Sequence, residues 1–213
     1  MAGPTRRLLY LTTLIILEGL LPGCATTGLP SPKNLELINS GKRSVVLLRI
    51  MCDIDGKPYE VFQSGLTADD PIGFGLGSFE TGGKPWFIVP KFFSDQTRKD
   101  GWMYLVLEPG LYYLAVQPPY QYDSSFPTSH LWRLDIPPKV KFVYIGTLHL
   151  PSTGENLNFG NIRILSFIWD SIVIRNEEET ARKIAAEFLP ELHPFKTMLM
   201  VKHEGPIILK TPN

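Results

Sequence analysis

Alternating apolar residues mark the first predicted strand of the chain, from Ser44 to Ile54. Side chains at a period of two lie on one face of a strand. One face is apolar throughout, with Val46, Leu48, Ile50, Cys52 and Ile54. The other face mixes apolar residues with Arg49 and Asp53, which predicts a strand with one fully buried side. The turn sequence 55–57 and a returning strand at 59–63 complete a predicted hairpin.

Two apolar runs between Trp102 and Gln117 flank the sequence Leu107-Glu108-Pro109-Gly110. Proline presets φ for the second position of a turn, and glycine accepts a positive φ at the third. The stretch resembles the Leu-x-Pro-Gly-x-x-Tyr corner of immunoglobulin-like and fibronectin-like sandwiches, with Tyr113 in the tyrosine position. A plain hairpin is the alternative, and the sequence leaves open whether Tyr112 or Tyr113 points inward.

Further segments are rich in β-branched and aromatic residues or alternate in hydropathy, which predicts more strands at 86–89, 131–136, 140–150 and 162–174. The segment 140–150 has the composition of a central strand. The length of 162–174 predicts a bulge or bend near Asp170-Ser171. Glycines alternate with Phe74 and Leu76 in segment 73–77, which indicates an edge strand or a loop lying close to another backbone.

The hydrophobic period changes to that of a helix over about 177–189, and Pro190 ends it. Asn176 and Glu179 have the spacing of a capping box. The apolar stripe consists of Ala181, Ile184, Ala185, Phe188 and Leu189. Segments 197–202 and 207–210 predict a terminal hairpin within 197–210. We therefore expect one mainly β domain over 44–213, an immunoglobulin-like or transthyretin-like antiparallel β-sandwich with one helix packed on it near the C-terminal end.

Residues 1–23 have the layout of a secretory signal peptide, with basic Arg6 and Arg7, an apolar run and a small-residue end. The apolar stretch 8–21 has 14 residues and is interrupted by Glu18. An α-helix needs about 20 residues to cross a bilayer, so a permanent transmembrane helix is not expected.

The end of this segment, Leu21-Pro22-Gly23-Cys24, resembles the lipobox of bacterial lipoproteins. The resemblance implies that Cys24 becomes the first residue of the mature protein, thioether-linked to diacylglycerol and acylated on its amine. Residues 24–43 are then expected to form the lipidated cysteine and a tether. Ala25 at the second mature position implies transfer to the outer membrane, with the domain facing the periplasm or the surface.

The chain has 213 residues, 44% of them hydrophobic, with 21 basic and 21 acidic residues. This composition is globular, and the balanced charge gives no reason to expect a nucleic-acid partner. Removal of 1–23 takes away two arginines and Glu18, which leaves 19 basic and 20 acidic residues. The expected membrane anchor is therefore lipid and not charge. Cys52, the other cysteine, is expected to be buried.

The order of elements resembles a family of bacterial envelope lipoproteins of undefined function. That family combines a lipobox with one β-sandwich, a Pro-Gly-x-Tyr hairpin, a Val-Tyr-Ile-Gly strand and a Glu-Glu-x-x-Ala-Arg helix. The matching pieces here are Pro109 to Tyr112, Val143 to Gly146 and Glu178 to Arg182. The resemblance implies a fold and a location, and it implies no catalytic residues.

No motif for catalysis, a cofactor or a metal emerges from the sequence. Gly41-Lys42 ends like a phosphate loop, but Glu36 stands at the position of the first glycine and a strand follows. The glycines of 73–77 are not followed by a predicted helix, as a dinucleotide loop requires. The histidines are isolated from one another, at His130, His149, His193 and His203.

The segment 118–132 is the candidate binding loop, because it carries the aromatic residues Tyr120, Tyr122, Phe126 and Trp132. Exposed aromatic side chains at the end of a sandwich suit an envelope protein, a glycan or lipid headgroups as partner. In the alternative interpretation these side chains fold back and cover the end of the sandwich.

Two functions of different classes remain. The first is a non-enzymatic lipoprotein, anchored in the membrane through its N-terminal lipid and acting as a structural or binding module of the cell envelope. The second is a lipid-tethered enzyme acting on envelope polymers, with a site assembled from residues distant in sequence. A cleft with converging carboxylates or histidines favours the enzyme, and a continuous aromatic patch favours the binding module.

Overall fold

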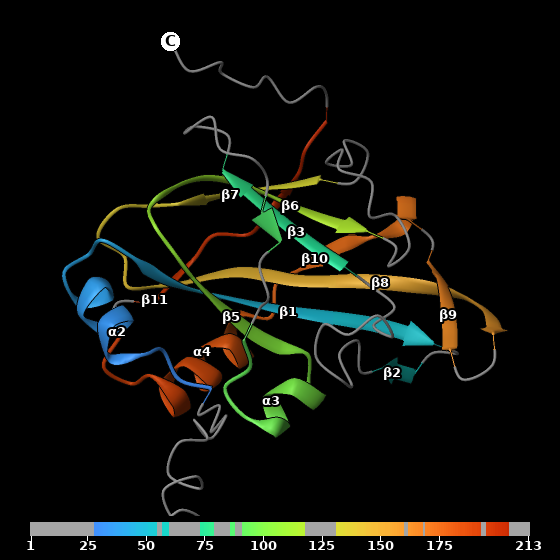
Figure 1. The fold of residues 1–213 in the computed structure, drawn as a ribbon, viewed down its shortest axis with the longest axis horizontal. Coiled ribbons are helices and arrows are strands. Elements are labelled where there is room, and N and C mark those ends of the chain that lie inside the picture. The colour runs from blue at the N-terminus through green and yellow to red at the C-terminus, as the bar shows by residue number, and fades with distance from the viewer. Residues whose placement is uncertain are drawn as a thin grey trace, which may run out of the picture.

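The computed structural model describes residues 28–54, 57–59, 73–78, 86–87, 91–117, 131–159, 162–167, 169–192 and 195–204. This part of the chain forms two β-sheets and three α-helices in layers (Figure 1). The larger sheet lies in the middle, between the smaller sheet and the helices. The predicted mainly β class is confirmed at this level.

Two long strands, β1 (Ser44–Ile54) and β8 (Phe142–Phe159), form the centre of the larger sheet. They run parallel to each other, and β11 (Phe195–Thr197) is also parallel to β8. The predicted purely antiparallel arrangement is therefore wrong for this sheet. The other described strands pair antiparallel at the edges: β5 (Trp102–Leu107) and β2 (Lys57–Tyr59) with β1, and β10 (Val173–Arg175) and β9 (Ile162–Phe167) with β8.

The smaller sheet is antiparallel throughout its described strands. Its order is β12 (Val201–Lys202), β7 (Leu131–Ile136), β6 (Gly110–Gln117), β3 (Gly73–Ser78) and β4 (Trp86–Phe87). The prediction of a strand at 131–136 is confirmed with the same bounds. The glycine-rich strand β3 is not the edge strand of this sheet, because it pairs with β6 on one side and with β4 on the other.

The main hydrophobic core fills the space between the two sheets. Strand β1 contributes the apolar face predicted from its alternation, and Val46, Leu48, Ile50 and Cys52 are all buried there. The smaller sheet contributes Tyr112, Leu114, Trp132, Leu134 and Ile136. Burial of Cys52 confirms the prediction made for that thiol. Each large side chain that is removed from water in this layer contributes about 1.5 to 3 kcal/mol.

The helices cover the opposite face of the larger sheet and form a second core there. The strand residues of this second core are Val45, Leu47, Trp102, Tyr104, Phe142 and Tyr144. The helices α2 (Pro32–Asn39) and α4 (Glu178–Phe188) pack on them with Ile38, Ala181 and Ala185, while α3 (Asp95–Lys99) lies beside β5. Strand β1 is thus buried on both faces, not on one as the sequence predicts.

Helix α4 confirms the predicted helix near 177–189, and its apolar stripe faces the sheet as expected. Its N-terminus differs from the prediction. Glu177 is the N-cap residue and makes no capping bond with its side chain. The carboxamide of Asn176 accepts a hydrogen bond from the backbone N–H of Glu178 at 3.1 Å, so the predicted capping box between Asn176 and Glu179 is not formed.

The sequence Leu107 to Gly110 joins the two sheets and is not a hairpin turn. Strand β5 pairs with β1 in the larger sheet, whereas β6 pairs with β3 and β7 in the smaller one. Tyr112 is buried, and its hydroxyl donates a hydrogen bond to the carbonyl of Glu108 at 2.8 Å. Tyr112, and not Tyr113, is therefore the inward tyrosine that holds this corner.

The last described segments differ from the predicted terminal hairpin. Thr197 ends β11 in the larger sheet, and Val201 begins β12 in the smaller one, so residues 197–202 cross between the sheets. Residues 207–210 lie outside the described part. The predicted bend near Asp170-Ser171 is confirmed, because a 3-10 turn at Trp169–Ser171 separates β9 from β10.

The N-terminal boundary of the folded part lies before Ser44. Pro32–Asn39, expected within the tether, is helix α2, and its Ile38 is fully buried against the larger sheet. Ser31 caps this helix by accepting a hydrogen bond from the backbone N–H of Asn34 at 3.4 Å. At the predicted hairpin, β2 pairs with β1 from Lys57 on, and residues 60–63 lie outside the described part.

Candidate functional site

A cluster of polar side chains lies where the N-terminus of α4 meets the larger sheet. Arg49 on β1 forms an ion pair with Glu177, with 2.9 Å between Nη1 and Oε2. The same guanidinium donates from Nε to the carbonyl of Asp100 at 2.7 Å and lies 5.3 Å from the ring of Trp102. Both partners of the ion pair are only partly exposed. One arginine therefore connects β1, the start of β5 and the start of α4.

Strand β8 adds two hydroxyl groups to this cluster. Thr147 donates a hydrogen bond to Glu177 Oε2 at 2.7 Å, and its oxygen lies 3.0 Å from the hydroxyl of Tyr144. An ionised carboxylate only accepts hydrogen bonds, so the proton of Thr147 points to Glu177 and Tyr144 is the donor to Thr147. The backbone N–H of Glu177 donates in turn to the Tyr144 oxygen at 3.1 Å.

The protonation states of the cluster follow from these contacts. Burial would raise the pKa of Glu177, but hydrogen bonds from Thr147 and Arg49 outweigh it and hold the pKa below its ordinary value. Burial raises the pKa of Tyr144 above its ordinary value, and its hydrogen bonds with Thr147 and with the Glu177 backbone only partly oppose this rise. Both pKa values thus lie further from neutrality than usual. A general acid or base works best with a pKa near the operating pH, so this arrangement favours a structural connection.

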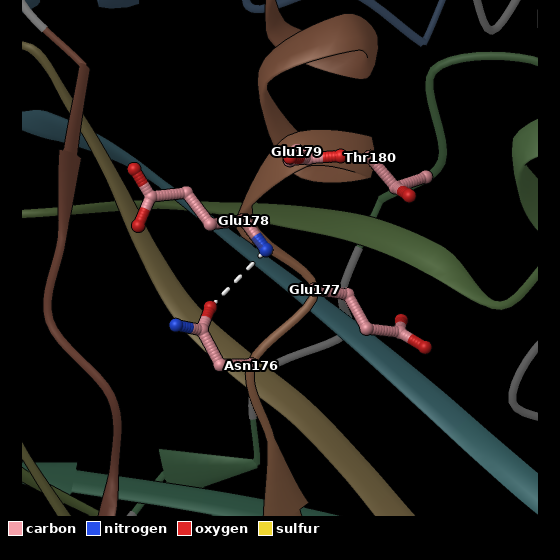
Figure 2. Close-up of a pocket in the computed structure, with 5 residues that line it drawn as sticks. All are labelled: Asn176, Glu177, Glu178, Glu179 and Thr180. Atoms are coloured by element: carbon pink, nitrogen blue, oxygen red, sulfur yellow. Dashed lines mark hydrogen bonds between the residues drawn. The ribbon is translucent and has the colours of Figure 1, made fainter.

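A pocket of about 400 Å³ adjoins this cluster and shares Glu177 with it. The residues that line it are Asn176, Glu177, Glu178, Glu179 and Thr180. Figure 2 shows that the side chains of Glu177 and Glu178 point to opposite sides of the backbone, so these two carboxylates do not converge. Glu178 is instead paired with Arg182 one helical turn later, at 2.5 Å. The hydrogen bonds that Arg182 donates to Glu178 lower the pKa of this carboxyl below its ordinary value.

We expect Glu177→Gln to lower the free energy of unfolding by about 1 to 3 kcal/mol at pH 7, because it leaves Arg49 without its charged partner. Since folding lowers the pKa of Glu177, its contribution is fully present above its ordinary value of 4.5 and is lost as pH falls through the folded value. Urea unfolding at pH 7 and at pH 3, followed by circular dichroism, measures both effects. The difference between wild type and variant should shrink at the lower pH.

Glu187→Gln is the matched control, because Glu187 is an exposed glutamate on the same helix. We expect it to change the free energy of unfolding by no more than about 0.5 kcal/mol. Equal losses in the two variants would show that the pair with Arg49 does not stabilise the fold.

The residues that the sequence singles out as functional are not brought together in the described part of the chain. Cys24, Tyr120, Tyr122 and Phe126 lie outside it. Trp132 is 1% exposed and belongs to the core between the sheets. The expectation that Trp132 is part of an accessible binding surface is therefore wrong. Its burial agrees with the alternative interpretation, in which aromatic side chains of this region pack inward.

Two of the four histidines are described, and they lie apart from each other in the fold. His149 is buried on β8, while His203 is half-buried, with its ring 5.0 Å from that of Tyr113. Within the described residues, no group of three or more histidine, cysteine, aspartate or glutamate side chains is placed to hold a metal ion. Within the same residues, no helix has the length and hydropathy to cross a membrane.

The chain was compared with protein families, curated proteins and solved structures. No family model, no curated protein and no solved structure matches the chain.

Proposed function

We propose that the protein is a lipid-anchored bacterial lipoprotein, a non-enzymatic structural or binding module of the cell envelope. The observation that carries this proposal is the order of the first 24 residues: a basic start with Arg6 and Arg7, an apolar run, and Leu21-Pro22-Gly23-Cys24. Cys24 is the residue to which the lipid is attached. One acyl chain holds a protein only marginally, whereas three chains on Cys24 anchor it durably.

Ala25 follows as the second mature residue, and on this basis the proposed location is the outer membrane. The partner in this proposal is an envelope protein or a glycan.

For the fold we propose a relation to immunoglobulin-like or transthyretin-like sandwiches. The corner at Leu107 to Gly110 supports it, because it carries the chain from one sheet to the other and is held by the hydroxyl of Tyr112. The parallel pairing of β1 with β8 is the feature in which this chain departs from the antiparallel plan of those sandwiches.

Cys24→Ser tests the anchor. We expect this variant to be released from the membrane fraction or to keep its signal peptide, because serine offers no thiol for the thioether bond. Fractionation of the cells followed by intact mass spectrometry measures both outcomes. The wild type should show the mass of a chain that begins at Cys24 and carries three acyl groups.

Cys52→Ala is the matched control, since it removes the other cysteine, which is buried in the core. It should fractionate with the membrane and keep the mass increment of the lipid. Lipidation would be refuted if Cys24→Ser left both the fractionation and the mass unchanged, or if the wild-type protein carried a bare thiol at Cys24.

A further inference from the structure

The described fold begins with a segment that lies directly on another part of the backbone. A Cβ atom added at Gly28 would be 1.7 Å from the carbonyl oxygen of Phe92 and 2.7 Å from the Cα of Phe93. Such a contact is possible only for glycine. Pro30, two residues later, is buried, and helix α2 follows at Pro32. The chain is thus fixed to the domain from Gly28 on, at the segment that leads into α3.

The length of chain between Cys24 and this fixed point is short. Four Cα-to-Cα steps separate Cys24 from Gly28, and a chain extends by at most about 3.6 Å per residue, so the span is at most about 14 Å. A compact domain of this size has a radius of gyration of about 16 Å. A lipid on Cys24 therefore holds the domain against the membrane with the side around Gly28 facing it, because the opposite side is out of reach.

The surface next to Gly28 has the chemistry for such a contact. Leu29 is 45% exposed, and Lys33 and Lys91 are also exposed. The exposed charged residues of segments 28–36 and 91–99 are three lysines, Lys33, Lys91 and Lys99, and two acidic residues, Glu36 and Asp95. Their net charge is +1, whereas the chain from Cys24 on has a net charge of −1. Basic residues beside an apolar side chain suit a surface of anionic phospholipids.

We propose that the surface around Gly28, with Leu29, Lys33 and Lys91, lies against an anionic phospholipid membrane. The side of the helix layer around Gly28, with α2 and α3, then faces the membrane, and the smaller sheet, with β12 at its edge, faces away from it (Figure 1). This orientation rests on the proposed lipid at Cys24. It replaces the tether expected from the sequence over residues 24–43 by the three residues 25–27, which join Cys24 to Gly28.

Two matched reporters test the orientation in the full-length lipidated protein. Lys91→Cys and Lys202→Cys each replace an exposed lysine, one next to Gly28 and the other on β12 of the smaller sheet. Each variant is made together with Cys52→Ala, labelled with a maleimide fluorophore and reconstituted into vesicles of phosphatidylethanolamine and phosphatidylglycerol. A nickel-chelating lipid then quenches fluorophores that lie near the headgroups. We expect quenching at position 91 to exceed that at position 202 by at least about twofold, given the short spacer.

A spacer variant provides the control. Insertion of twelve glycine and serine residues between Thr27 and Gly28 gives a flexible tether that spans about 20 Å on average and far more when extended. This variant should still bind vesicles, and the excess of quenching at position 91 over position 202 should be smaller than with the native spacer. Equal quenching with the native spacer, in protein that binds the vesicles, would overturn the orientation and leave the anchor standing. Protein that does not bind vesicles would overturn the anchor and the orientation with it.

Discussion

Replacement of Trp132 by alanine is expected to lower the free energy of unfolding by about 3 to 5 kcal/mol, the range for large aromatic side chains removed from a core. Trp132 is 1% exposed and lies between the two sheets, on β7, where it pairs with Leu114 of β6. Alanine would leave a cavity that both sheets would have to close. Urea unfolding followed by far-ultraviolet circular dichroism measures the loss without relying on tryptophan fluorescence.

Arg133→Ala is the matched control, because Arg133 is the next residue of the same strand and is exposed on the other face. It should change the free energy of unfolding by no more than about 0.5 kcal/mol. If Trp132→Ala had an equally small effect, Trp132 would belong to the surface, as the binding-loop interpretation of the 118–132 segment requires.

Local patterns predict the strands well where one period dominates. The alternation in β1 places Val46, Leu48, Ile50 and Cys52 correctly in the core, and the short segment 131–136 is a strand with the predicted bounds. Trp132 shows where such reasoning fails. Its aromatic neighbours in sequence point to a loop, but its own strand alternates, and the buried position follows from that alternation.

The pairing of strands is not visible in any local pattern. The neighbours of β1 are β5 and β2 on one side and β8 on the other, and β8 begins almost ninety residues after β1 ends. Hydropathy shows which face of a strand is buried, but not which distant strand lies beside it. The corner at Leu107 to Gly110 is an exception, because a short motif determines where the chain changes sheets.

The polar cluster of Arg49 and Glu177 is only half visible in the sequence. Arg49 lies between apolar residues of a strand whose only other charged residue is Asp53, and a long charged side chain in such a place needs a partner. Glu177 can be read as a residue that favours the positive end of a helix dipole. Their ion pair joins positions 128 residues apart, so only the fold brings them together. An arginine flanked on both sides by apolar residues of a predicted strand is the signal that could have found this cluster.

Gly101→Ala is expected to destabilise the fold by roughly 3 to 5 kcal/mol, among the largest effects of a single added methyl group. Gly101 has φ +77°, which costs an alanine about 1 to 2 kcal/mol. The added Cβ would also lie 2.2 Å from the carbonyl oxygen of Ile50. That backbone cannot move freely, because the N–H of Ile50 donates to the Gly101 carbonyl at 3.0 Å and Arg49 pairs with Trp102 in the β1 to β5 register.

Gly41→Ala separates the two costs, since Gly41 has a similar φ of +72° but an added Cβ there would lie 3.5 Å from its nearest neighbour, an ordinary contact. It should pay only the conformational cost of about 1 to 2 kcal/mol. For a domain of this size each kcal/mol lowers the melting temperature by about 2 to 4 °C, so thermal unfolding should place Gly101→Ala roughly 5 to 10 °C below Gly41→Ala. Equal melting temperatures would mean that β1 and the start of β5 are not held as close together at Gly101 as the fold requires.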